Sequence, residues 1–98
     1  MAHPIFEKIK MLPESYSEGM YQGRKYGITK NSFNQGNSFK VYAEELGGTD
    51  FISLNYYRTK SQGLLKPCEM PEQKVIDFLE NVSLVKSEQN VNIDRSNV

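Results

Sequence analysis

The sequence predicts an α+β domain, in which an antiparallel sheet of four to five strands forms a meander and a C-terminal helix packs on one face. Between residues 20 and 66, apolar residues recur with a period of two, which is typical of strands with one buried face. After Pro71 the period changes to that of an amphipathic helix. The two periods together indicate this class.

The clearest expected element is a hairpin over residues 38–58, because Gly47-Gly48-Thr49-Asp50 separates two alternating apolar runs. The residues expected to face the core are Phe39, Val41 and Ala43 in the first run and Ile52, Leu54 and Tyr56 in the second. For both sets to face one core, the numbers of paired residues must add to an odd sum. This requires an even-length loop, either Gly47-Gly48 alone or all of residues 47–50.

Two strands are expected before this hairpin. They run over Met20 to Gln22 and over Lys25 to Phe33, and they are joined around Gly23-Arg24. The cluster Asn34-Gln35-Gly36-Asn37 then forms a turn, because its residues tolerate positive φ.

A short fifth strand and a helix are expected after the hairpin. Leu64 to Lys66 runs into Pro67, whose missing N–H confines the strand to an edge of the sheet. Pro71 is expected at the first helical position. The predicted buried face of this helix consists of Val75, Phe78, Leu79 and Val82.

Residues 14–85 are therefore predicted to form one α+β domain. Residues 1–13 are expected to be an N-terminal arm or a short helix, because Ile5, Ile9 and Leu12 have helical spacing before Pro13. Residues 86–98 are mostly polar and are predicted to be a disordered tail.

The composition is that of an ordinary globular domain, with 38% hydrophobic and 24% charged residues among 98. The formal net charge is zero, so no long-range field attracts nucleic acid or an anionic membrane. No apolar run approaches the roughly 18 residues of a spanning helix, and the first residues contain no secretory signal pattern. One cysteine excludes an intrachain disulfide. A cytoplasmic location is expected.

The predicted sheet has a second face that the C-terminal helix does not cover. The residues expected to form a ligand or partner surface there are Lys40, Tyr42, Glu44, Asn55 and Tyr57. Three interpretations remain open at this stage. The face is solvated, as antiparallel sheets permit, or it joins two copies as a homodimer, or it binds a small-molecule ligand or another partner whose identity is unknown.

Cys68 is the one residue on which thiol chemistry could depend. The dipole of the following helix and Lys66 favour the thiolate, whereas Glu69 opposes it. A nucleophilic cysteine also needs a base or a resolving thiol, and the chain has one histidine, His3, and no second cysteine. We therefore expect Cys68 to be a small buried side chain.

The sequence contains no convincing metal, cofactor or phosphate motif. Glu44, Glu45 and Asp50 bracket the hairpin but lack the spacing of a calcium loop. The recurring Gly19, Gly23 and Gly27 lead to no helix N-terminus. No metal site and no cofactor are expected.

Three segments, residues 24–29, 42–53 and 66–71, resemble a family of small bacterial proteins of unknown function. Some members are labelled peptide methionine sulfoxide reductase, which implies a thiol enzyme with Cys68 as its nucleophile. The chain lacks the Gly-Cys-Phe-Trp signature of one reductase class. We predict a binding or self-associating module without catalysis, with the Cys68 reductase as the alternative.

Overall fold

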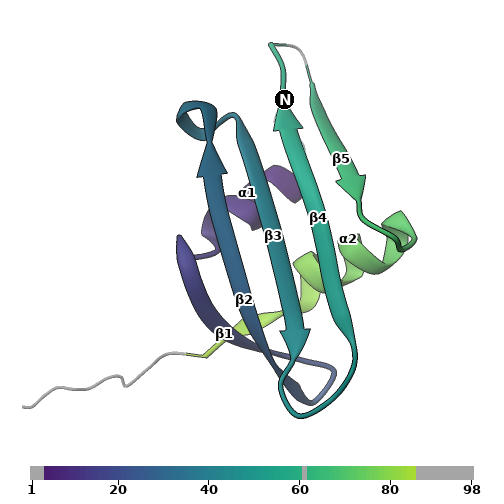
Figure 1. Cartoon of the computed structure of the whole chain (residues 1–98). Helices are drawn as coiled ribbons and strands as arrows, with labels where there is room; N and C mark the ends of the chain where they lie inside the picture. Colours follow the sequence, from purple (N-terminus) through teal and green to yellow (C-terminus); the bar gives the residue numbers. More distant parts are fainter. Residues whose placement is uncertain (1–3, 61, 86–98) are drawn as a thin grey trace, which may run out of the picture.

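The computed structural model describes residues 4–60 and 62–85. In chain order the elements are α1 (Pro4–Met11), β1 (Ser15–Tyr21), β2 (Arg24–Phe33), the 3-10 turn η1 (Asn34–Gly36), β3 (Ser38–Glu45), β4 (Phe51–Arg58), β5 (Gly63–Pro67), α2 (Glu72–Asn81) and β6 (Ser83–Leu84). The strands form one antiparallel sheet in the order β5-β4-β3-β2-β1-β6. Both helices lie behind the same face of this sheet (Figure 1). The predicted fold class is confirmed.

The register of the β3–β4 hairpin follows the expected rule. Val41 pairs with Leu54, and Ala43 pairs with Ile52, so the paired numbers add to an odd sum and both apolar sets face the core. Glu45 N–H donates to the Asp50 carbonyl at 2.8 Å and closes a four-residue loop, Leu46 to Thr49. This is the register predicted for a loop centred on Gly47-Gly48. The loop itself is longer than those two glycines by one residue on each side, Leu46 and Thr49.

The β1–β2 hairpin differs from the prediction in its length and its turn. The turn residues are Gln22 and Gly23, with φ of 54° and 76°, rather than Gly23-Arg24. Two successive positive φ angles characterise a type I′ turn, whose twist matches that of paired strands. β1 begins at Ser15 rather than Met20. The sequence pattern did not predict this start because Ser17 and Gly19, on the core side of the strand, are small and give no apolar alternation.

A sixth strand lies beyond the predicted sheet. Ser83 and Leu84 pair with Met20 and Gly19 on the outer edge of β1. A Cβ atom at Gly19 would lie 2.8 Å from Val82 Cγ2, so the glycine permits this close approach. The described sheet therefore has six strands, one more than the largest number predicted, and the additional strand is β6. At the opposite edge, β5 ends the sheet as expected.

The N-terminal segment is part of the core rather than an arm. The side chains of Ile5, Phe6, Ile9 and Leu12 are all buried. The Phe6 ring lies 6.0 Å from the rings of Phe39 and Tyr56 between their centroids. Two helices, not one, therefore cover the sheet.

Lys30 fastens the end of α1 to the sheet. Its side chain is buried, and Nζ donates to the carbonyls of Ile9 and Lys10 at 3.2 and 3.4 Å. The Ile9 carbonyl also accepts a hydrogen bond from the Leu12 N–H at 3.1 Å, and Pro13, which lacks an N–H, cannot supply its usual i+4 donor. Burial lowers the pKa of Lys30. A buried lysine is thus accommodated beside the apolar core because its ammonium group is hydrogen-bonded to backbone carbonyls.

Helix α2 closes the other half of the core. Val75, Phe78 and Leu79 are buried and Val82 packs against them, as predicted. Pro71 occupies the N-cap position rather than the first helical position. The Phe78 ring meets the rings of Tyr21 and Tyr26 edge-on, with centroids 5.0 and 5.4 Å away. The predicted tail, residues 86–98, lies outside the described residues.

Candidate functional site

The candidate site is the sheet face turned away from both helices, which we call the open face (Figure 1). Strand pairing aligns its side chains in rows that cross the strands. The basic row consists of Asn31, Lys40, Asn55 and Lys66. The tyrosine row consists of Tyr16, Thr29, Tyr42 and Ser53, and the acidic row of Glu18, Gly27, Glu44 and Phe51. Basic and acidic groups therefore flank a central aromatic row.

All five residues predicted for a partner surface lie on the open face: Lys40, Tyr42, Glu44, Asn55 and Tyr57. Asn55 is half-buried and the other four are exposed. The strand register places these residues on one face of the sheet. What they bind is a separate question.

The open face also exposes apolar side chains that the sequence analysis missed. Tyr16 and Phe33 are 57% and 53% exposed, and Leu64 adds a further exposed side chain at the β5 edge. Tyr16 was missed because β1 was expected to begin only at Met20. Phe33 and Leu64 could have been assigned from their even spacing with neighbouring face residues. Apolar side chains that gather on one exposed face are candidates for contact with a partner.

The centre of the open face is covered by the protein's own side chains and is not a cleft. Ser53 is 7% exposed even though it faces away from the helices. Beside it, the rings of Tyr42 and Phe51 lie 6.2 Å apart. Tyr16 lies across Gly27, where a Cβ atom would be 2.7 Å from the tyrosine oxygen, and its hydroxyl donates to Glu18 Oε2 at 3.0 Å. The face suits another flat surface better than a small enclosed molecule.

Cys68 lies at the β5 end of the tyrosine row. Its backbone N–H donates to the Ser53 carbonyl at 2.9 Å, and the Asn55 amide donates to Sγ at 3.5 Å. Cys68 is half-buried, whereas a small buried side chain was expected. An amide donor does not remove the thiol proton, so these contacts do not create a nucleophile.

Of the three acidic residues around the β3–β4 hairpin, Glu45 and Asp50 lie together, with the Asp50 N–H donating to Glu45 Oε1 at 3.2 Å, and Glu44 lies apart from them. Glu44 lies on the open face, whereas Asp50 accepts hydrogen bonds from Tyr26 and Lys74, each at 2.7 Å. The Lys74 ammonium is the main reason that the pKa of Asp50 lies below its ordinary value, and the Tyr26 hydroxyl adds to the effect. Across residues 4–60 and 62–85, no three side chains among His, Cys, Asp and Glu gather as a metal site would require.

A second tyrosine joins α2 to the sheet nearby. Tyr21 donates to Asp77 on the helix, and burial followed by this bond raises the pKa of Tyr21 to about 12. Burial raises the pKa of Tyr26 as well. The tyrosines and carboxylates therefore hold α2 in position, and neither acid is free for ligand binding.

The Asp50 contacts predict a specific loss of stability in acid. Because the folded-state pKa of Asp50 is lowered, its contribution is complete above the unfolded value of about 3.9 and disappears as the pH falls through the folded value. Urea unfolding between pH 6 and pH 2.5 should therefore show a smaller pH dependence for Asp50→Asn than for the parent. Glu80→Gln, at an exposed position on α2, is the control. An unchanged pH slope in Asp50→Asn would contradict the assignment.

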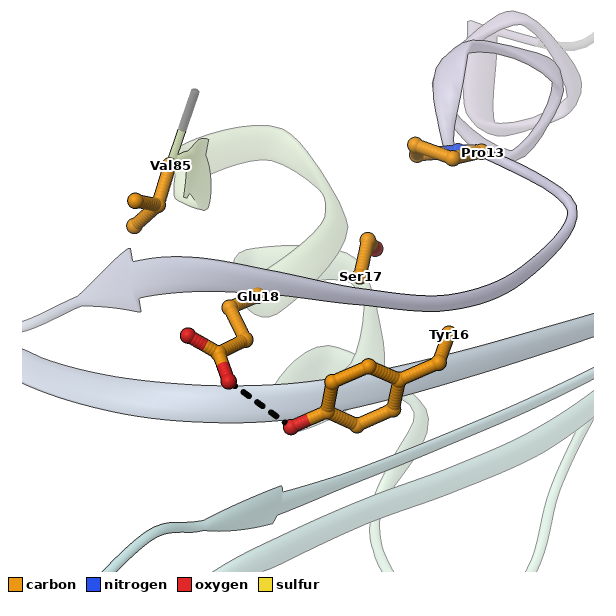
Figure 2. Close-up of a pocket in the computed structure, with 5 residues that line it drawn as sticks. All are labelled: Pro13, Tyr16, Ser17, Glu18 and Val85. Carbon is orange, nitrogen blue, oxygen red and sulfur yellow. Dashed lines mark hydrogen bonds between the residues drawn. The ribbon is translucent and has the colours of Figure 1, made fainter. Parts of the chain in front are cut away.

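A pocket of about 530 Å³ lies away from the centre of the open face, beside β1. It is lined by Pro13, Tyr16, Ser17, Glu18 and Val85 (Figure 2). Ser17 points to the opposite side of β1 from Tyr16 and Glu18 (Figure 2). Cys68 does not line this pocket, which therefore offers no support for thiol chemistry.

The chain was compared with protein families, with curated proteins and with solved structures, and none of the three comparisons found a match. Neither of the helices that the structure describes has the length and apolar character needed to cross a bilayer. A function must therefore be argued from the geometry of the open face.

Proposed function

We propose that this protein is a self-associating module in which two copies pair through their open faces. The observation that carries the proposal is the order of charges along β3. Lys40 and Glu44 lie on the open face, two residues before and two residues after Tyr42. A second copy turned by 180° about an axis through Tyr42 finds an opposite charge at each of these positions.

The direction of the two-fold axis follows from this pattern. An axis that crosses the strands over Tyr42 reverses β3 of the second copy, so each Lys40 lies over the other copy's Glu44. The offset from the axis is about 7 Å for each residue, because strands rise about 3.4 Å per residue. An axis parallel to the strands would instead place Lys40 on Lys40. Charge complementarity therefore selects the crossing axis.

The exposed apolar side chains supply the attraction. Tyr42 would meet its own copy on the axis, and Tyr16 and Phe33 would lose contact with water. Five strands at about 4.8 Å spacing, each about eight residues long, cover roughly 650 Å² per copy. The total of about 1,300 Å² is at the lower end of specific interfaces. We expect a dissociation constant of about 10–100 µM.

The proposal also explains why the central row is uncharged. Thr29, Tyr42 and Ser53 carry groups that can approach an identical copy without repulsion. A solvated face would not require this separation of the basic row from the acidic row. The contacts of Cys68 give no comparable support to the thiol-enzyme alternative, because its sulfur meets an amide.

Charge reversal on β3 tests the proposal. Lys40→Glu places like charges opposite each other twice per dimer and should weaken association at least tenfold. The double variant Lys40→Glu with Glu44→Lys restores the opposite charges and should recover most of the affinity. Sedimentation equilibrium between 1 µM and 1 mM measures both, and Lys8→Glu, on the exposed side of α1, is the control.

Two results would overturn the proposal. The first is a parent protein that stays monomeric up to 1 mM. The second is a double variant that associates no better than Lys40→Glu, which would exclude the crossing axis. NMR line broadening confined to open-face residues at high concentration would locate the contact independently.

A further inference from the structure

Charge is separated along the strands of the open face. One half of the face lies on the side of η1, the turn that joins β2 to β3 at one end of the sheet (Figure 1). This η1 half consists of the basic row, Asn31, Lys40, Asn55 and Lys66, and of a row nearer the end of the sheet, Phe33, Ser38, Tyr57 and Leu64. The two rows contain two lysines and no acid, so the η1 half is a positive surface.

The lysines of the η1 half have no acidic partners in the part of the chain that the structure describes. The ion pairs found there all lie on the other side of the tyrosine row: Arg24–Glu45, Lys25–Glu18 and Lys74–Asp50. Glu14 lies near β2 at the η1 end, but its two carboxylate oxygens accept hydrogen bonds from the Ser32 N–H and hydroxyl at 2.8 and 2.7 Å. The charges of Lys40 and Lys66 are therefore available to a ligand.

The rim beside the η1 half adds further positive charge. Arg58 ends β4 and Lys60 follows it, and both side chains are exposed. The Arg58 guanidinium carbon lies 4.3 Å from the centre of the Phe6 ring, a cation–π contact that orients the group. Charges are screened over about 8 Å at physiological salt, so the local charge, and not the zero total, decides what can bind here. A chain of phosphates matches this surface.

Two exposed aromatic rings lie beside these lysines. Phe33 and Tyr57 are 53% and 40% exposed and belong to one row, two strands apart. Two strand spacings amount to about 9.6 Å. Lys40 lies on β3, the strand between the two rings, and one row further from the end of the sheet. If one base stacked on each ring, the phosphates between those bases would pass over β3, within reach of the Lys40 ammonium group.

We propose that the η1 half binds single-stranded nucleic acid, with bases stacked on Phe33 and Tyr57 and phosphates held by Lys40 and Lys66. A flat face suits unpaired bases, because each base offers a π-face to an aromatic ring. An acidic peptide would also match the lysines, but its carboxylates make no use of the two rings. Nucleic acid binding here does not depend on the proposed dimer. Both ligands need the same face, so the nucleic acid binds the monomer.

Substitution of the rings tests the stacking. Fluorescence anisotropy of a labelled dT12 oligonucleotide measures binding at 50 mM NaCl. Phe33→Ala and Tyr57→Ala should each weaken binding at least fivefold. Phe33→Tyr keeps a ring and should bind within twofold of the parent. Met11→Ala, which removes an exposed apolar side chain from α1, is the control. Thermal melting checks that each variant is folded, as expected for exposed positions.

The salt dependence of binding tests the phosphate contacts. For single strands, the logarithm of the affinity falls by about 0.7 per logarithmic unit of salt for each neutralised phosphate. Two contacts therefore predict about a sevenfold loss of affinity between 50 and 200 mM NaCl. Lys66→Gln should lower the slope by about 0.7. Lys8→Gln changes an exposed lysine of α1 and should leave the slope unchanged.

Other probes identify the ligand class. Binding of dT12 or of rU12 supports the proposal, and the tighter of the two shows whether DNA or RNA is the ligand. A 12-base-pair duplex should bind at least tenfold more weakly than dT12, because its bases are already stacked on one another. Absence of binding up to 100 µM protein, equal binding of the duplex or of a twelve-residue polyglutamate, or full binding after loss of both rings would overturn the proposal. None of these results alters the sedimentation of the free protein, which tests the dimer separately.

Discussion

Phe78→Ala is expected to lower the free energy of unfolding by about 3–5 kcal/mol. The side chain is fully buried, and its ring contacts the rings of Tyr21 and Tyr26. Removing the ring leaves a cavity between α2 and the sheet, because both tyrosine hydroxyls are held by carboxylates and cannot move freely into the space. A domain of this length has a total stability of about 5–15 kcal/mol, so the variant is expected to be close to unfolding at 37 °C.

Urea denaturation followed by circular dichroism measures this effect. Glu80→Ala changes an exposed residue of the same helix and should alter stability by less than about 0.5 kcal/mol. A loss of less than about 1 kcal/mol in Phe78→Ala would mean that α2 does not close the core. In that case the pH dependence assigned to Asp50 should disappear as well, since Lys74 lies on the same helix.

Ile9→Ala is expected to cost about 2–5 kcal/mol. Ile9 is fully buried in the first helix, and its carbonyl accepts a hydrogen bond from the buried Lys30 ammonium. The loss of packing should therefore also disturb this buried hydrogen bond. This result distinguishes a helix within the core from a dispensable N-terminal arm.

Met11→Ala is the matched control, because Met11 belongs to the same helix and is 72% exposed. Both substitutions introduce alanine, so the intrinsic helix propensity changes little between them. Chemical denaturation of the two variants should differ by at least about 2 kcal/mol. Equal stabilities would mean that α1 contributes nothing to the folded domain.

The sequence by itself determined the β3–β4 hairpin, its odd-sum register and the buried face of α2. These elements depend on local periodicity, and their apolar residues keep one period over a complete element. The same alternation predicts that Lys40, Tyr42 and Glu44 lie on the face away from the core, and the strand pairing places them there. The basic, tyrosine and acidic rows combine residues of several strands, so they could be assigned only from the strand pairings of the folded chain.

The tertiary structure decided the two ends of the chain and the polar contacts within the core. β1 begins among serines, and β6 has two residues, so neither shows a usable period; each becomes a strand because a neighbouring edge accepts its hydrogen bonds. Lys30 is buried because the end of α1 presents carbonyls to its ammonium group. These contacts join residues distant in sequence, and sequence periodicity describes only the order within one element. The pairing partner of an edge and the partner of a buried charge are therefore properties of the folded chain.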